Sequence, residues 1–287
     1  MAAILVRHIT PSIKEPGLSE DFSIRDLGSL LQDRDMVQEL HRHDFFLVLA
    51  IEKGKGEHCI DFISYPVNDH AVFCMRPGQV HQLRLKKGST GYVMQFGGGF
   101  YSPRGKQATH LLRKVSSKNH CKISSARFGK LLAVLKNIFE EYSGKQDKYK
   151  EVIKASLEIF FIELARQSNN PARIANDSNN YAQERLEELS ALLEKNIATT
   201  KQAAQYAAMM HLTPYQLNAI TRSTVGKTCS ELINEHILLE AKRNLLATSA
   251  QVNQVADDLG YEDVSYFIRF FKKHTGYSPE VFRHNFK

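Results

Sequence analysis

The stretch VNQVADDLGYEDVSYFIRFFKKHTGYSPEVF, residues 252–282, decides how the rest of the chain is organised. Its first part carries apolar residues at i, i+3, i+4 and i+7, the spacing of one apolar stripe on a helix: Val252, Val255, Ala256 and Leu259. Gly260 then ends this helix, because glycine tolerates the positive φ of a helix C-cap. The pattern predicts a short helix followed by a tight turn.

A second helix follows the turn, and its two faces differ in chemistry. Asp263 is placed to cap it, because a side-chain carboxylate accepts hydrogen bonds from the first free backbone N–H groups. The inward face is aromatic and consists of Phe267, Phe270 and Phe271. The opposite face is a polar and cationic ridge of a size that fits a DNA major groove: Ser265, Arg269 and Lys272. Any amphipathic hairpin has a solvated basic side, so the hairpin by itself leaves both interpretations open.

The same hairpin recurs about 50 residues upstream in the chain. The apolar positions of its first helix are Ala203, Tyr206, Ala207 and Met210. The inward positions of its second helix are Leu217, Ile220 and Thr221, with Thr213 as cap and Gly226 as stop. We therefore expect two helix-turn-helix units joined by a long helix near 230–247. Units held apart in this way would set their second helices into successive major grooves, about 34 Å apart.

The outward faces of the two second helices supply the candidate DNA-binding residues. In the first unit these are Tyr215, Gln216, Asn218 and Arg222. In the second unit they are Val264, Ser265, Arg269, Lys272 and Lys273. Tyr215 can pack on a thymine methyl group, Asn218 can pair with adenine, and Arg269 can bind guanine.

Charge and composition restrict the class of protein. The formal net charge is +7, yet residues 181–287 hold 12 Lys/Arg and 12 Asp/Glu, so the surplus lies upstream of the hairpins. No apolar run approaches the roughly 20 residues that span a bilayer, and no signal peptide is recognisable, so we expect a cytoplasmic protein without membrane contact. The four scattered cysteines predict buried free thiols rather than disulfides or a zinc site.

The N-terminal half is rich in short β segments, namely 45–51, 58–63, 70–75, 81–85 and 92–96. Turn residues separate them, which favours an antiparallel sandwich or barrel. Helical spacing then predicts helices over 128–139 and 147–167, and the second is apolar enough to need cover on two sides, either within its own domain or from a second subunit. The polar segment 168–180 reads as a linker between an α+β domain, 1–167, and an all-helical domain, 181–287.

The last hundred residues resemble the AraC/XylS family of bacterial transcriptional regulators. The strongest match is LLATSAQVNQVADDLGYEDVSYFIRFFKKHTGYSPEVFR, residues 245–283. The resemblance implies a double helix-turn-helix domain that binds promoter DNA, a regulator such as an activator rather than an enzyme, RNA polymerase as a partner and a homodimer. The first unit departs from the family pattern, with His211 at the turn glycine, Ala219 at a common base-reading arginine and Thr221 at a core aromatic.

The N-terminal half resembles the family's cupin-like effector domain through HRHDFFLVLAIEKGKGE (41–57) and RPGQVH (76–81). His41 and His43 share one face of a strand, and His81 follows a turn, so the three imidazoles can meet inside a barrel. A metallo-cupin enzyme is the rival interpretation, but Leu47 and Val48 stand where its carboxylate ligand is expected. Hydrogen-bonded structural histidines are a further alternative.

The resemblance implies a pocket for a small-molecule effector, with no metal and no cofactor. Its candidate residues are His41, His43, His81, Arg76, Arg84 and Tyr92. The stretch 70–139 holds 13 cations and no acid, which favours an anionic effector bound near Arg76, Arg84, Lys86 and Lys87. Solvated surface lysines explain the same stretch without a ligand.

Overall fold

The computed structural model describes residues 6–7, 21–101, 111–112, 115–116, 118–168 and 177–286. The chain divides into two compact units at residues 171/172. Within the described residues, no helix is both long and apolar enough to cross a membrane.

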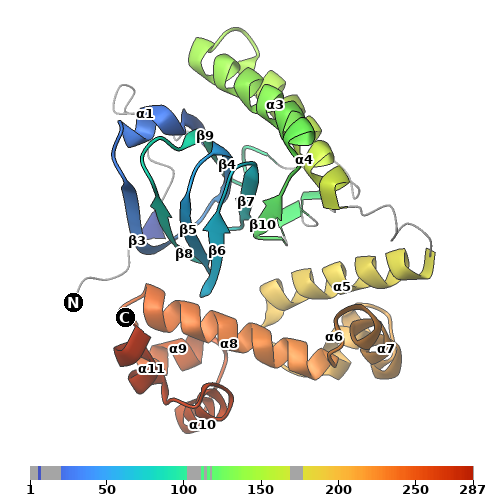
Figure 1. The fold of residues 1–287 in the computed structure, drawn as a ribbon. Helices are drawn as coiled ribbons and strands as arrows, with labels where there is room; N and C mark the ends of the chain where they lie inside the picture. The colour runs from blue at the N-terminus through green and yellow to red at the C-terminus, as the bar shows by residue number, and fades with distance from the viewer. Residues whose placement is uncertain are drawn as a thin grey trace. The chain divides into compact units, whose positions relative to one another are not determined.

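The first unit is built on two five-stranded sheets (Figure 1). One sheet has the order β1 (Val6–Arg7), β3 (Met36–His43), β8 (Val80–Leu85), β5 (Gly56–Ile60) and β6 (Ile63–Val67). The other has the order β10 (His120–Lys122), β7 (Ala71–Met75), β4 (Phe46–Lys53), β9 (Thr90–Phe96) and β2 (Phe22–Asp26). Every pairing is antiparallel except that of β1 with β3. The predicted α+β class with an antiparallel β domain is therefore confirmed.

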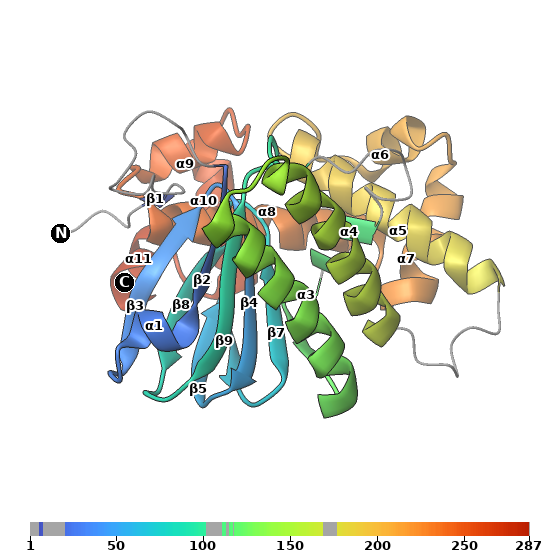
Figure 2. The same ribbon diagram turned by 90° about the horizontal axis from the view of Figure 1, so that it is seen from above.

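Side chains on the two faces of β4 enter two separate apolar cores. Leu47, Leu49 and Ile51 point into the space between the sheets, together with residues of β5, β7 and β8 and of α1 (Leu27–Leu31). Val48 and Ala50 point to the other side, where they pack with α3 (Ser125–Gly144) and α4 (Tyr149–Ser168). Figure 2 shows these two helices side by side along the sheet. The continuous apolar run of β4, residues 46–51, is thus explained by cover on both faces.

Two strand predictions were incomplete. The segment 58–63 is broken by Asp61 and Phe62, whose φ values of 47° and 68° turn the chain between β5 and β6. Pro66 falls between the predicted segments 58–63 and 70–75, where turn residues were expected, but it lies inside β6, which tolerates it because β6 is an edge strand. The strands β2, β3 and β10 were not predicted, since each lacks a run of apolar residues. Among the cysteines, Cys74 and Cys229 are buried, whereas Cys59 and Cys121 are only half-buried.

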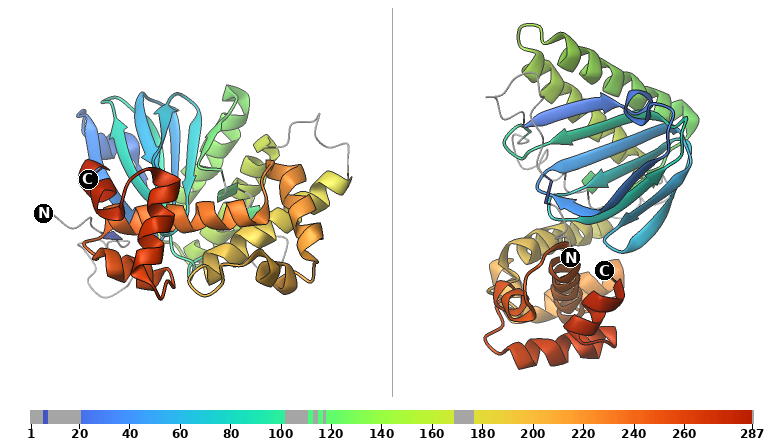
Figure 3. Two further views of the ribbon diagram at one scale, coloured as in Figure 1. Left: turned by 90° about the horizontal axis from the view of Figure 1, so that it is seen from below. Right: turned by 90° about the vertical axis from the view of Figure 1, so that its left-hand side faces the viewer.

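The second unit is all helical. Its elements are α5 (Asp177–Asn196), α6 (Ala203–Met209), α7 (Pro214–Val225), α8 (Cys229–Ala247), α9 (Val252–Asp258), α10 (Val264–Thr275) and α11 (Pro279–Phe286). Because α5 begins at Asp177, the last four residues of the predicted linker belong to a helix. The long helix α8 runs between the pair α6–α7 at one end and α9–α11 at the other (Figure 3). The two predicted helical hairpins and the helix that joins them are confirmed.

Candidate nucleic-acid interface and histidine cluster

Helix α10 is fixed by its cap and by its aromatic face. Asp263 Oδ1 accepts a hydrogen bond from the backbone N–H of Ser265 at 2.7 Å, and Gly276 ends the helix with φ 81°. Phe267 and Phe271 are fully buried, whereas Phe270 is only half-buried against Tyr261 and His274. The aromatic face holds α10 rigidly, so its opposite face is presented in a defined orientation.

The outward face of α10 is exposed to solvent. It contains Ser265, Arg269, Lys272 and Lys273, as the sequence predicts. Arg269 Nη2 lies 3.7 Å from Asp263 Oδ2. Tyr266, which the sequence analysis did not select, is 58% exposed on the same side, three residues before Arg269. Helical spacing could have found it, because positions i and i+3 are neighbours on a helix surface.

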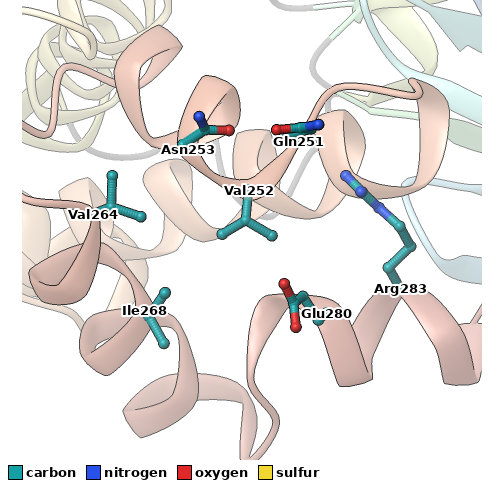
Figure 4. A pocket seen from close by; sticks show the side chains of 7 residues that line it. All are labelled: Gln251, Val252, Asn253, Val264, Ile268, Glu280 and Arg283. Carbon is teal, nitrogen blue, oxygen red and sulfur yellow. The ribbon is translucent and has the colours of Figure 1, made fainter.

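Val264 does not stand on this ridge. It is half-buried and lines a groove of about 480 Å³ between α9, α10 and α11 (Figure 4). The other lining residues are Gln251, Val252, Asn253, Ile268, Glu280 and Arg283. Five residues separate Val264 from Arg269, which places the two side chains roughly 140° apart around the helix. Val264 is therefore turned away from the face proposed to read bases.

Helix α7 has a stronger N-terminal cap than α10 but a weaker outward face. The Thr213 hydroxyl accepts from Gln216 N, while Gln216 Oε1 accepts from Thr213 N at 2.9 Å, which completes a capping box. Gln216 is thus engaged at the helix start. Tyr215 is 84% exposed and Arg222 is also exposed, so both remain available to a partner.

Asn218 is turned away from the predicted contact. It is half-buried, and its Oδ1 accepts a hydrogen bond at 2.9 Å from the backbone N–H of Cys229, the first residue of α8. The expected pairing of Asn218 with adenine is therefore not supported by the geometry. The helix repeat assigns a face to Asn218 but does not identify its partner, so this role is not visible in the sequence.

The turns of the two hairpins differ in one residue. Gly260 has φ 68°, and a Cβ atom there would lie 1.6 Å from the carbonyl oxygen of Ala198. His211 takes the same place in the first hairpin with φ 55°. This is the left-handed region, which residues other than glycine adopt only at a cost in free energy. The first hairpin therefore makes the family-like turn without glycine.

In the β unit, three buried histidines form a hydrogen-bonded row across neighbouring strands. His41 Nδ1 lies 2.7 Å from the carbonyl oxygen of Glu39, His81 Nε2 lies 2.9 Å from His41 Nε2, and His58 Nε2 lies 2.9 Å from His81 Nδ1. Since a carbonyl only accepts, His41 Nδ1 must carry the proton, and neutral rings then donate from His81 to His41 and from His58 to His81. All hydrogen bonds of the row therefore run in one direction, from His58 toward His41, and His58 Nδ1 keeps a lone pair.

His43 adjoins this row, and its Nδ1 donates to the carbonyl oxygen of Phe45 at 2.8 Å. Its ring centre lies 5.1 Å from that of His81. Burial, followed by the charges of His43, His41 and His120, lowers the pKa of His58 to about 3. Across the described residues, no three His, Cys, Asp or Glu side chains are placed to hold a metal ion.

Two of the other predicted ligand residues, Arg84 and Tyr92, do not join the histidines. Arg84 is exposed, on the opposite face of β8 from His81 and Leu83. Tyr92 packs on Phe139 of α3 at 5.6 Å, on the helix-covered face of the second sheet, because side chains alternate along β9. The two residues therefore lie outside the space between the sheets.

In the predicted anion site, Lys86 and the backbone of Lys87 are already engaged by an acid. Lys86 Nζ forms a 2.8 Å ion pair with Asp35, and the backbone N–H of Lys87 donates to the same carboxylate at 2.9 Å. These hydrogen bonds lower the pKa of Asp35. The acid-free stretch is thus partly neutralised by an acid from outside it, a pairing that the linear sequence does not reveal.

Comparison with known families gives the same division of the chain. Residues 31–161 match the model of the AraC-like ligand binding domain, and residues 206–285 match that of a helix-turn-helix domain. The chain belongs to the AraC family of transcriptional regulators. As a member of the AraC family it is a DNA-binding regulator with an N-terminal ligand-binding domain, and it is not an enzyme.

Several AraC-family relatives match over most of their length. The transcriptional activator RhaS of Escherichia fergusonii is 22% identical, with 85% of this chain and 86% of RhaS covered. The uncharacterized regulator YfiF of Bacillus subtilis is 20% identical, over 86% of this chain and 79% of YfiF. The crystal structure of unsaturated fatty acid-bound ToxT from Vibrio cholerae superposes with a TM-score of 0.44 at 17% identity, covering 91% of this chain and 94% of ToxT.

Proposed function

We propose that this AraC-family regulator reads promoter DNA with two unequal helices, α10 as the main base reader and α7 as a weaker partner. The observation that carries the proposal is the outward face of α10, where Arg269 is exposed above a rigid aromatic core. Arginine binds the O6 and N7 atoms of guanine with two hydrogen bonds, the commonest specific contact in the major groove. Helix α7 offers Tyr215 for apolar contact with a base.

Placed cations, rather than overall charge, supply the affinity in this proposal. The region 181–287 is formally neutral, so a general attraction to the phosphate backbone is weak. Arg222, Lys272 and Lys273 are exposed near the ends of the two reading helices and are assigned to phosphates. Phosphate contacts set the register, and Arg269 then selects the base.

Selection of bound duplexes from a random DNA pool tests this function. We expect a motif with two blocks whose centres lie about 10 base pairs apart, because α8 separates the two reading helices by a fixed length. The block read by α10 should contain a guanine and be the stronger of the two. Recovery of no motif, with equal binding to all duplexes, would contradict sequence-specific reading.

We also propose that α4 pairs with the same helix of a second copy. Val152, Ile159 and Ile162 are exposed apolar residues at i, i+7 and i+10, and Ile159 is 52% exposed. With the exposed Ala155 they follow the alternating spacing of three and four residues that paired helices use. A two-fold pairing of this face covers it in both subunits at once.

The effector of the ligand-binding domain is assigned to the histidine end of the space between the sheets. His41, His43, His58 and His81 bring polar groups into a core that is otherwise apolar. The preference for an anion loses support, because Lys86 is already paired and Arg84 faces outward. Thermal-shift screening of carboxylates against matched neutral compounds decides the class: we expect stabilisation by neutral hydrogen-bonding compounds, and stabilisation by carboxylates alone would restore the anionic effector.

The remaining assignments follow from the family. We propose residues 1–167 as the effector and dimerisation domain, 168–180 as the linker and 181–287 as the DNA-binding domain. RNA polymerase is the proposed further partner, because several relatives are named transcriptional activators. A regulator of bacterial promoters acts in the cytoplasm.

A further inference from the structure

The two reading helices use different caps for the same job. At α10, Asp263 Oδ1 accepts from Ser265 N, whereas at α7 the hydroxyl of Thr213 accepts from Gln216 N. Thr213 shows that capping in this fold does not require a charge. A carboxylate at this position is unfavourable for DNA binding, because it adds negative charge at the end of the helix that faces a polyanion. Capping alone therefore does not explain why residue 263 is an aspartate.

The second carboxylate oxygen supplies that reason. Asp263 Oδ2 lies 3.7 Å from Arg269 Nη2. The position equivalent to Arg269 in α7, fifty residues earlier, is Ala219, and the position equivalent to Asp263 is Thr213. Within one chain, the acidic cap thus occurs on the helix with an arginine six residues after the cap, and it is absent from the helix with an alanine at that position.

Solvent makes this pair weak in the free protein. The Arg269 and Asp263 side chains are 67% and 62% exposed, and an ion pair in such a setting contributes little to stability. The situation changes when a duplex covers both groups and removes water. A buried carboxylate then requires a donor, and the donors within its reach are Arg269 and the amino groups on the base edges.

We propose that Asp263 is a specificity-determining residue for DNA reading, one that orients Arg269 toward guanine and itself accepts a hydrogen bond from the amino group of a neighbouring cytosine or adenine. Its Oδ1 atom keeps the cap of α10 and its Oδ2 atom faces the base. A base without an amino group at that site, or a base other than guanine under Arg269, leaves the carboxylate without its full set of donors. The free-energy cost of a buried carboxylate without its donors then discriminates against these bases. The inference rests on the proposed function.

The test uses the full-length protein and the duplex selected by it, with Asp263→Thr as the main variant. Threonine keeps the cap, as Thr213 does in α7, and removes only the carboxylate. We expect binding to random DNA to be equal or tighter, while discrimination against substitutions at the guanine and its neighbour falls about five- to tenfold. In the Arg269→Ala background, the same Asp263→Thr change should have a much smaller effect at the guanine.

Two controls keep the test decisive. Asp263→Asn keeps both the shape and the cap, so the same loss of discrimination confirms that the charge matters. Thr213→Asp places a carboxylate on α7, where Ala219 gives it no arginine, and should weaken binding to all duplexes alike. Unchanged discrimination in Asp263→Thr would overturn the inference while leaving the proposed function intact. A wild-type protein that fails to discriminate at all would instead overturn the proposed function.

Discussion

The side-chain oxygen Oδ1 of Asn218 accepts a hydrogen bond from the backbone N–H of Cys229 at 2.9 Å and so ties the reading helix α7 to the start of α8. Fifty residues later, the equivalent positions hold Ile268 and Pro279. Proline has no N–H to satisfy, and isoleucine has no acceptor to offer. The polar pair that joins α7 to α8 is thus replaced by two apolar residues at the equivalent positions of α10 and α11.

Replacement of Asn218 with alanine tests this structural role. The N–H of the buried Cys229 would lose its acceptor, so the free energy of unfolding should fall by about 1–2 kcal/mol. The ranking of bases in the selected duplex should stay the same. Urea denaturation and competition binding measure the two effects. A changed base preference with unchanged stability would return Asn218 to the DNA-reading set.

Substitutions at the two hairpin turns should change the free energy of unfolding in opposite directions. His211→Gly should raise the free energy of unfolding by about 0.5 kcal/mol, because it relieves a left-handed residue at some loss in chain entropy. Gly260→Ala should lower the free energy of unfolding, and the size of this change should be several times that of His211→Gly. The reason is that a Cβ atom would lie 1.6 Å from the Ala198 carbonyl oxygen. Thermal and urea unfolding of both variants compare them directly. Equal effects of the same sign would contradict this reading of the turns.

The buried histidine row makes stability depend on pH. The pKa of His58 is about 3 in the folded protein, against 6.5 for an ordinary histidine. Well above pH 6.5 the His58 ring is neutral in both the folded and the unfolded protein, so its contribution to the free energy of unfolding is fully present. Below pH 6.5 the unfolded chain binds a proton that the folded chain excludes, so the free energy of unfolding should fall by about 2 kcal/mol between pH 7 and pH 5.

A matched variant tests whether His58 causes this pH dependence of the free energy of unfolding. His58→Gln keeps a donor for His81 Nδ1 but does not titrate, so the decline between pH 7 and pH 5 should be smaller in the variant than in the wild type. Urea titrations at each pH give both curves. An undiminished slope in His58→Gln would place the proton uptake elsewhere.

The exposed stripe on α4 predicts a change in oligomeric state. Ile159→Glu puts a charge in the centre of the proposed helix pair, so the protein should sediment as a monomer at concentrations where the wild type is a dimer. Lys130→Glu, an exposed change on α3, is the control and should leave the dimer intact. Sedimentation velocity separates the two states. A dimer in both variants would move the interface away from α4.

The fold was predictable where one local pattern decides it. The apolar spacing around Val255 and Phe267 and the cap at Asp263 specify the second hairpin, because helix periodicity and capping depend on near neighbours. Strand β3 was missed because it lacks a run of apolar residues, and only its pairing with a distant segment identifies it as a strand. His41 pairs with His81 on a neighbouring strand, forty residues along the chain.

The candidate sites show the same limit more sharply. The gathering of His41, His43 and His81 followed from strand alternation and a turn, whereas His58 entered the row only through the pairing of β5 with β8. Lys86 was expected at an anion site, but Asp35 on a distant segment already pairs with it. Sequence patterns assign a face to a residue, whereas the partner of that residue depends on the tertiary fold.

The affinity of Arg269→Ala for the selected duplex and for random DNA tests the central claim most directly, with Lys272→Ala as the matched cation change. Arg269→Ala should lower specific affinity by about 1–3 kcal/mol, relax selection at one base and leave binding to random DNA nearly unchanged. Lys272→Ala should weaken binding to every sequence alike. Equal losses on specific and random DNA for Arg269→Ala would contradict base reading by α10.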